Sequence, residues 1–98
     1  MLPKKNRLTA REVRATLKEG KSVRKSSVSA RFVSTAKAGK AAIVVSTKVA
    51  RKATDRNRLR RMGYAALPTP LPKGNLVLFI QTPEFKTADI LSLCSTLS

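Results

Sequence analysis

Four arginines fall within six residues of this chain, in the run Arg-Asn-Arg-Leu-Arg-Arg at 56–61. A guanidinium group binds phosphate oxygens through two parallel hydrogen bonds and stacks on bases, which a lysine ammonium cannot do. Asn57 adds a donor and an acceptor that suit ribose or a base edge. Because like charges this close repel one another, we expect the run to contact a polyanion. The candidate RNA-binding residues are Lys48, Arg51, Lys52, Arg56, Asn57, Arg58, Arg60 and Arg61.

The charge of the whole chain is strongly positive and uneven. Its 98 residues include 21 Lys and Arg against five Asp and Glu, a net charge of +16. Residues 1–61 contain 19 of the basic and three of the acidic side chains, and residues 62–98 contain two of each. Self-repulsion at this density destabilises a compact chain, and a polyanionic partner relieves it. We therefore expect the first two thirds to bind nucleic acid and the last third to supply structure.

The side chains that catalysis or metal binding requires are scarce. The chain has no histidine and one cysteine, and no two of its five carboxylates lie three or four residues apart. Acid-base catalysis and metal coordination need such groups to converge. We expect no catalytic residue, no metal ligand, no cofactor bound by the protein alone and no small-molecule substrate. Cys94 lies in an apolar helical stripe and reads as a buried thiol.

The sequence also shows neither a signal-peptide pattern nor an apolar run long enough to cross a membrane. The first residues carry charge but no apolar segment of the kind a signal peptide has. The longest apolar run, 76–80, is too short to span a bilayer. We expect a cytoplasmic protein.

The arginine run needs a helix to display it, and we expect one from Thr54 or Asp55 to residue 66. Thr54 is a good N-cap candidate, and prolines after residue 66 close the helix. At about 100° per residue, three apolar side chains share one side and can dock on a sheet, which leaves the arginines outside. These are Leu59, Met62 and Ala66. Gly63 costs about 1 kcal/mol relative to alanine, so the helix either ends early or approaches a neighbour closely there.

Three strands are expected to form the sheet. Residues 26–34 alternate, with Val28, Ala30 and Phe32 on one face and serines, Arg31 and Val33 on the other. Residues 41–46 are apolar on both faces, which favours a central strand. A turn at 37–40 predicts that these two strands form an antiparallel hairpin. The third strand is expected at 75–82.

Two further helices complete the expected fold, a single domain over 1–98 with a basic arm at 1–8 and a proline-rich loop at 67–74. The first helix runs from Thr9 to about residue 19, with Glu12 at capping-box spacing and Gly20 ending it. The last runs from about 87 to 97. Its apolar face is expected to contain Ile90, Leu91, Cys94 and Leu97.

Residues 46–61, Ser-Thr-Lys-Val-Ala-Arg-Lys-Ala-Thr-Asp-Arg-Asn-Arg-Leu-Arg-Arg, strongly resemble the signature of the bacterial ribonuclease P protein subunit. The opening at 2–8 and the Gly-Lys-Ser-Val turn at 20–23 also look like that family. The resemblance implies an α+β fold, a roughly four-stranded sheet packed with helices, of the ribosomal S5-like type with a left-handed β-α-β crossover. It also implies a partner of the ribonuclease P catalytic RNA, which removes the 5′ leader of precursor tRNA. The RNA subunit would hold Mg²⁺ and perform the hydrolysis.

In this family the protein holds the leader in a cleft between the sheet and the first helix, which aromatic side chains commonly line. At the matching positions this chain has Val13, Leu17, Val28 and Arg31, and Phe32 follows Arg31 in the sequence. A base stacked on an aromatic ring contributes about 1–3 kcal/mol, so we expect weaker stacking here. Arg31 would substitute for an aromatic ring by binding the leader through its positive charge. The family also commonly has a basic residue where this chain has Tyr64.

Two other classes of protein share some of these features. A ribosomal or generic RNA-binding protein would have the charge and the sheet, but would not explain residues 56–61 with their flanks. A cationic membrane-surface protein needs an amphipathic helix rich in large apolar residues. The helix at 54–66 offers only Leu59, Met62 and Tyr64.

Overall fold

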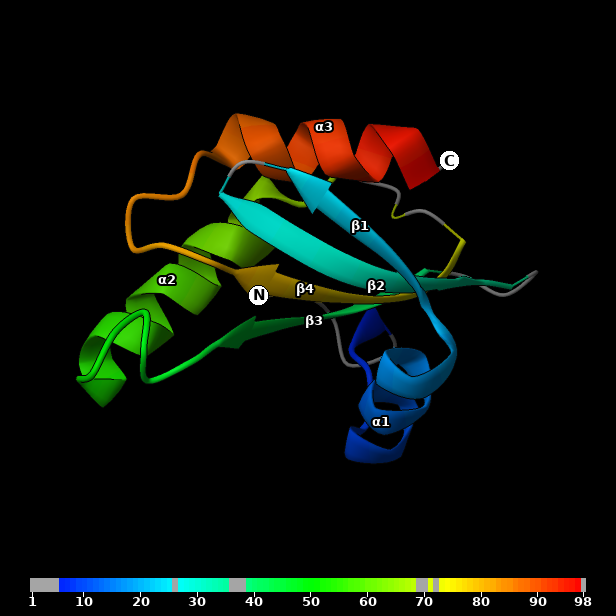
Figure 1. The fold of residues 1–98 in the computed structure, drawn as a ribbon, viewed down its shortest axis with the longest axis horizontal. Helices are drawn as coiled ribbons and strands as arrows, with labels where there is room; N and C mark the ends of the chain where they lie inside the picture. The colour runs from blue at the N-terminus through cyan, green and yellow to red at the C-terminus, as the bar shows by residue number, and fades with distance from the viewer. Residues whose placement is uncertain (1–5, 26, 36–38, 69–70, 72, 98) are drawn as a thin grey trace.

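The computed structural model describes residues 6–25, 27–35, 39–68, 71 and 73–97. Parts of the expected arm at 1–8 and of the expected loop at 67–74 lie outside these residues. The described elements form one four-stranded sheet with three helices (Figure 1). In chain order they are α1 (Ala10–Glu19), β1 (Lys21–Lys25), β2 (Val28–Ser34), β3 (Lys40–Val45), α2 (Ala53–Ala66), β4 (Gly74–Ile80) and α3 (Thr87–Leu97).

The strand order is β1-β2-β4-β3. β2 pairs with β1 and β4 in antiparallel fashion, and β3 pairs with β4 in parallel. The expected hairpin between β2 and β3 is therefore wrong, because β4 lies between them. The chain leaves β3, crosses through α2 and returns as the parallel neighbour β4. Parallel neighbours require a connection of this kind, since a short turn cannot reverse the chain twice.

β3 is an edge strand and not the central one that its apolar composition predicted. Ala41, Ile43 and Val45 are buried on one face, and the intervening residues are half-buried on the other. Part of its outer edge is covered by residues near the N-terminus. Arg7 forms a parallel bridge with Ala41, and the Leu8 N–H donates to the Ala41 carbonyl at 3.3 Å. An edge strand whose N–H and C=O groups are paired is protected from further strand addition.

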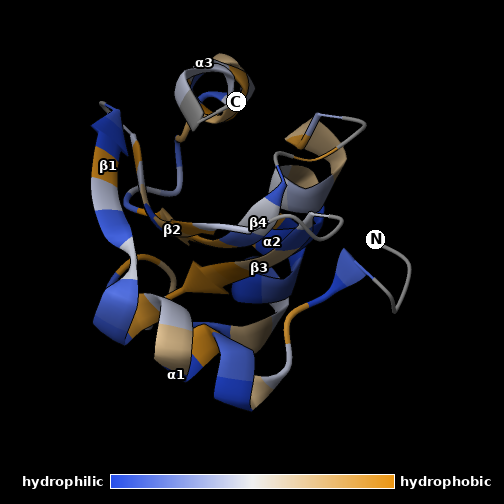
Figure 2. Cartoon of the chain, turned by 90° about the vertical axis from the view of Figure 1, so that its right-hand side faces the viewer, coloured by the Kyte–Doolittle hydropathy of each residue, from blue (hydrophilic) through white to orange (hydrophobic). Residues whose placement is uncertain are grey.

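One face of the sheet forms the core beneath α2 and α3, while α1 lies on the other side (Figure 2). As the alternation predicted, Val28 and Ala30 of β2 are buried here, opposite Ile80 and Leu78 of β4. Each large aliphatic side chain buried in this way contributes about 1.5–3 kcal/mol. Leu59 of α2 and Ile90 of α3 close the core from above.

The docking faces of α2 and α3 differ from the expected ones. Met62 is 43% exposed, and Gly63 takes its place against the sheet beside Leu59. In α3, Leu91 is 49% exposed, whereas Leu93 is fully buried with Cys94. α2 begins at Ala53, one residue before the expected cap Thr54, and its N-cap Lys52 makes no side-chain capping bond.

Gly63 sits inside α2 because the helix approaches β3 closely there. A Cβ at this position would lie 2.7 Å from Ile43 Cδ1. The helix continues through to Ala66, so the close approach, and not an early end, explains the glycine. Gly20 is similar: its φ of −73° suits any residue, but a Cβ would lie 2.5 Å from the Thr16 carbonyl oxygen.

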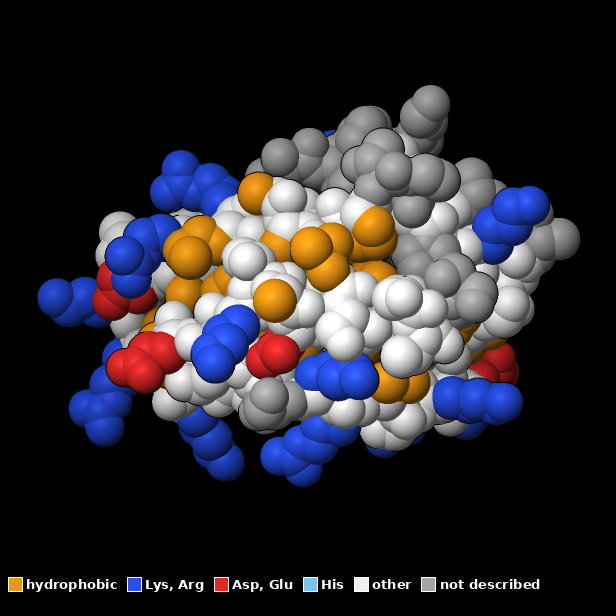
Figure 3. Space-filling model, turned by 90° about the horizontal axis from the view of Figure 1, so that it is seen from above, with side chains coloured by type: hydrophobic (Ala, Val, Ile, Leu, Met, Phe, Trp, Pro, Cys, Tyr) orange, Lys and Arg blue, Asp and Glu red, His pale blue; other side chains and the backbone are white. Residues whose placement is uncertain are grey.

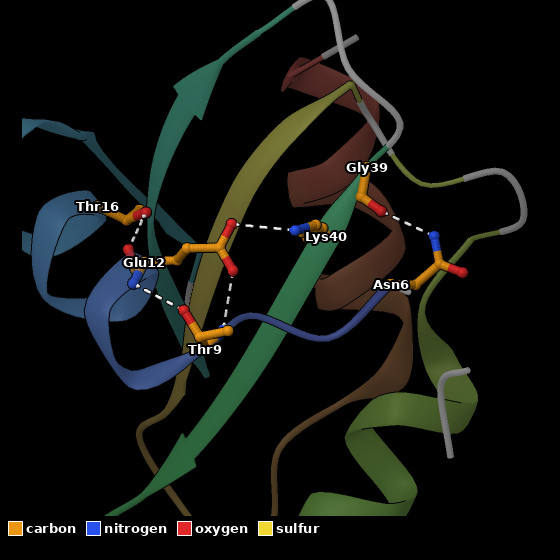
Figure 4. A network of polar contacts seen from close by, with 6 residues as sticks. All are labelled: Asn6, Thr9, Glu12, Thr16, Gly39 and Lys40. Carbon is orange, nitrogen blue, oxygen red and sulfur yellow. Dashed lines mark hydrogen bonds and ion pairs between the residues drawn. The ribbon is translucent and has the colours of Figure 1, made fainter. Parts of the chain in front are cut away.

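The capping box predicted for α1 is confirmed. The Glu12 N–H donates to Thr9 Oγ at 3.2 Å, and the Thr9 N–H donates to Glu12 Oε1 at 3.0 Å. The second oxygen of the same carboxylate accepts from Lys40 Nζ at 3.1 Å, which ties α1 to β3 (Figure 4). A strand, β1, was not expected, because only Val23 of its five residues is apolar. No helix in the described part of the chain is long and apolar enough to cross a membrane.

Candidate nucleic-acid interface

The four arginines of α2 are not equivalent in the structure. Arg56 is half-buried, and its Nη1 donates to the carbonyl oxygens of Ala50 at 3.0 Å and Arg51 at 2.7 Å. The guanidinium group of Arg56 therefore fixes the loop between β3 and α2 to the first turn of the helix. This contact makes Arg56 a positioning residue for its basic neighbours.

Arg60 and Asn57 lie one turn apart on the helix surface and bond to each other, Arg60 Nη2 donating to Asn57 Oδ1. Arg58 and Arg61 are exposed and form no hydrogen bond or ion pair with any described residue. Within the described part of the chain, the donors of both guanidinium groups have no partner. Of the predicted RNA-binding residues in α2, these two are the best placed to bind phosphate.

The loop before α2 extends this basic surface. The N–H groups of Val49 and Ala50 both donate to the Ser46 carbonyl, and the two side chains pack against the core. This turn leaves Lys48, Arg51 and Lys52 exposed beside the positive end of the α2 dipole. We call the combined region the arginine surface. It consists of Lys48, Arg51, Lys52, Arg58, Arg60 and Arg61.

The opposite face of the sheet carries a second group of polar side chains. Arg31 of β2 is exposed, and its Nη1 donates to the Leu17 carbonyl at the end of α1 at 3.1 Å. Val13 and Leu17 of α1 are half-buried. Hydrogen bonds from Thr9 and Lys40 hold the pKa of the Glu12 carboxyl below its ordinary value. The carboxylate thus stays ionised and keeps α1 against this face.

The structure does not bring all the expected leader-binding residues together. Val28 and Phe32 are 0% and 8% exposed and belong to the core beneath α3. They point to the face of the sheet opposite Arg31, because neighbouring residues of a strand alternate. Val13, Leu17 and Arg31 remain on the side of α1.

Phe79 of β4 is an aromatic residue on this side that the sequence analysis missed. It pairs with Ser29 of β2 and Val44 of β3 and is half-buried, outside the core cluster. Gln81 Nε2 donates to Ser29 Oγ at 2.6 Å beside it. We call Ser29, Arg31, Phe79 and Gln81 the open sheet face. Residues 76–80 are all apolar, so the sequence did not indicate which of them lies on this side.

Groups suited to catalysis do not gather in the described part of the chain. It contains no group of three or more His, Cys, Asp or Glu residues that would hold a metal ion. Burial raises the pKa of the Cys94 thiol to about 11. Such a thiol is protonated at neutral pH, and the nucleophile in cysteine chemistry is the thiolate.

A mixed sheet whose two parallel strands are joined by an arginine-rich helix, with a basic loop before that helix, defines a small α+β protein with a strongly basic surface. A family model described as Ribonuclease P matches residues 2–98. The chain therefore belongs to the ribonuclease P protein family and is the protein component of that holoenzyme.

Solved structures agree on the fold. The ribonuclease P protein from Thermotoga maritima superimposes with a TM-score of 0.72 at 22% identity, covering 94% of this chain and 97% of that one. The protein from Staphylococcus aureus gives a TM-score of 0.68 at 16% identity, covering 94% and 91%. No curated protein sequence matches the chain.

Proposed function

We propose that this protein component of ribonuclease P binds the catalytic RNA through the arginine surface and the 5′ leader of precursor tRNA through the open sheet face. The RNA subunit holds Mg²⁺ and hydrolyses the phosphodiester, and the complex works in the cytoplasm. The observation that carries the proposal is the pair of exposed guanidinium groups, Arg58 and Arg61, beside a loop that Arg56 holds in place. Phosphate contacts of this kind dominate affinity for nucleic acid.

The leader assignment rests on the chemistry of the open sheet face. Phe79 offers a ring for stacking, and Arg31 offers charge next to it. Extended single strands bind to this combination of aromatic and basic side chains with little sequence preference. α1 has the aliphatic residues Val13 and Leu17 where the family commonly has aromatic ones. Phe79 supplies an aromatic ring from the sheet instead.

The two surfaces lie on opposite sides of the sheet, so their variants should separate two kinds of binding. Replacing Arg58 and Arg61 by Ala should weaken affinity for the RNA subunit about tenfold or more at physiological salt, whatever the substrate. Arg31→Ala and Phe79→Leu should leave that affinity nearly unchanged, and should weaken binding of precursor tRNA only when its leader is several nucleotides long. The measurement is a pair of binding curves per variant, with the RNA subunit and with assembled enzyme.

Lys86→Ala is the matched control, because Lys86 is an exposed basic residue at the start of α3, on neither surface. It should change neither curve. Equal loss of RNA-subunit affinity in Arg31→Ala and in the helix double variant would contradict the two-surface model. A ribosomal or general RNA-binding role would be indicated if sequencing of the RNA copurified from the native host recovered no ribonuclease P RNA.

A further inference from the structure

A hollow along α2 shares Arg60 and Arg61 with the arginine surface, but the function proposed above does not use it as a pocket. Asn57, Arg60, Arg61 and Tyr64 line it, and its volume is about 390 Å³. These residues are spaced three and four apart, so they form one stripe along the helix. The volume falls within the range of pockets that bind small organic groups, about 300–1,000 Å³.

Tyr64 forms a fixed wall of this hollow. Its hydroxyl oxygen accepts a hydrogen bond from the Ile43 N–H at 3.3 Å, on the outer edge of β3. The side chain is half-buried and packs against the core cluster. A ring held at both ends in this way lines the hollow and can bind a ligand at little cost in conformational entropy, because few of its torsions remain to be ordered.

The other residues of the hollow supply charge and hydrogen bonds. Arg60 is held by the Asn57 side-chain oxygen, which leaves the Asn57 amide N–H groups available as donors. Arg61 is exposed and unbonded among the described residues. A planar ring, a free guanidinium group and an amide donor together match a nucleotide: a base to stack, a phosphate to bind and an acceptor on the base or ribose.

We propose that this hollow takes one unpaired nucleotide of the bound RNA, with its base stacked on Tyr64 and its phosphate on Arg61. The inference rests on the proposed binding of RNA to the arginine surface. It adds a stacking contact, which does not depend on charge, beside the charged side chains of Arg60 and Arg61.

Salt titration separates stacking from charge. Tyr64→Leu keeps an apolar side chain of useful size but removes the ring, and should lower affinity for the ribonuclease P RNA about 5- to 150-fold. The slope of log K against log salt should stay the same, because no phosphate contact is lost. Arg61→Ala should instead reduce that slope by about one. Tyr64→Phe keeps the ring and should bind within about twofold of the unaltered protein.

Two outcomes of that titration would overturn the inference. One is a Tyr64→Leu variant that binds as tightly as the unaltered protein. The other is a Tyr64→Phe variant that loses as much affinity as Tyr64→Leu, since the hydroxyl contact with β3 would then be the feature that matters. Melting curves for each variant identify any loss caused by unfolding.

A second experiment needs no RNA subunit, so its failure is distinct from failure of the proposed function. Tyr64 is the only tyrosine and the chain has no tryptophan, so its emission reports on the hollow alone. Adenosine monophosphate should quench this emission with a saturating curve, after correction with free tyrosine. Ribose 5-phosphate, which has the same phosphate and no base, should not. Equal responses to both probes, or no response to either, would overturn the stacking of a base on Tyr64.

Discussion

At the scale of single residues, Arg56 differs in role from Arg58, although both belong to the same run. Arg56 donates to two carbonyl oxygens of the loop, whereas Arg58 is exposed and bonds to no residue that the structure describes. Hydrogen bonds from charged groups contribute more to stability than neutral ones, because the charge strengthens the attraction to the acceptor. Sequence spacing alone cannot separate these roles.

Arg56→Ala should therefore lower both stability and RNA affinity. The expected loss in the free energy of unfolding is about 1–2 kcal/mol, since a half-buried pair of charge-assisted bonds disappears. Arg58→Ala should change stability by less than about 0.5 kcal/mol and lower RNA affinity alone. Urea denaturation of both variants, alongside RNA binding, checks this. Equal stability of the two variants would contradict the positioning role of Arg56.

Glu12 links acid sensitivity to the docking of α1. Because its pKa is lowered in the folded protein, the carboxylate stabilises the fold at pH values above its ordinary pKa of 4.5. That contribution is lost as the pH falls through the lowered folded value. Gln in place of Glu12 preserves the capping acceptor but not the charge.

The difference in stability between the unaltered protein and Glu12→Gln should be constant near neutral pH and shrink as the solution is acidified below about 4.5. It should be small, and smaller at high salt, because the ion pair with Lys40 is partly exposed. Denaturation curves over a pH series provide the measurement. A difference that grows on acidification would show that the sign of the shift is wrong.

At the scale of elements, the sequence predicted every helix and three of the four strands. Periodicity and capping residues located α1, α2, β2 and α3, and an unbroken apolar run located β4. Periodicity failed for β1, because Val23 is the one apolar residue among five and is only half-buried. It also misplaced β3, because an edge strand with apolar side chains on both faces has the composition of a central one. Pairing partners depend on the crossover through α2, which no local pattern records.

Only part of the candidate site could be predicted from the sequence. The arginine surface follows from residue types and helical spacing. The open sheet face does not, because Phe79 and Arg31 lie in strands far apart in the chain and become neighbours only through the pairing of β2 with β4. Val28 and Phe32 were wrongly assigned to the leader cleft. They lie three residues and one residue from Arg31 in the same strand, so their side chains point to the opposite face of the sheet.

The contact between α2 and β3 gives a test at this scale. Gly63→Ala gains about 1 kcal/mol in helix propensity but sets its Cβ 2.7 Å from Ile43 Cδ1. In the unaltered background the clash should exceed the gain, and the variant should be less stable. Ile43→Val removes the Cδ1 atom, so Gly63→Ala should be neutral or stabilising in that background. A double-mutant cycle measures the coupling, which should be about 1–2 kcal/mol. Additive effects would contradict the close approach.

At the scale of the whole molecule, the positive charge is concentrated in residues 1–61, whereas the core draws on both parts of the chain. Seen from the side of α3, most basic side chains project from the rim, and apolar and neutral groups fill the centre (Figure 3). Asp89 of α3 accepts from the Ser27 hydroxyl at 2.6 Å and so holds α3 to the start of β2. The basic residues of 1–61 repel one another in the folded state more than in the expanded one.

Sulfate should therefore stabilise the free protein beyond its effect on ionic strength. An anion that binds only the folded state at ten times its dissociation constant adds about 1.4 kcal/mol. For a chain of this length the melting temperature should rise by about 5–10 °C. Sodium chloride at matched ionic strength should do less, and the Arg58 and Arg61 double Ala variant should respond less to sulfate. Identical melting curves in the two salts would rule out specific anion binding.

The short pairing of residues 6–8 with β3 also bears on how the protein behaves at high concentration. Asn6 Nδ2 donates to the Gly39 carbonyl at 2.9 Å, and Leu8 bonds to Ala41, so these residues occlude one end of a strand reading Ala-Ala-Ile-Val-Val (Figure 4). Once uncovered, that strand has the β-branched composition that templates intermolecular sheets. Trimming the chain to begin after residue 8 should leave the RNA-binding groups intact, yet shorten the soluble lifetime of the protein on storage.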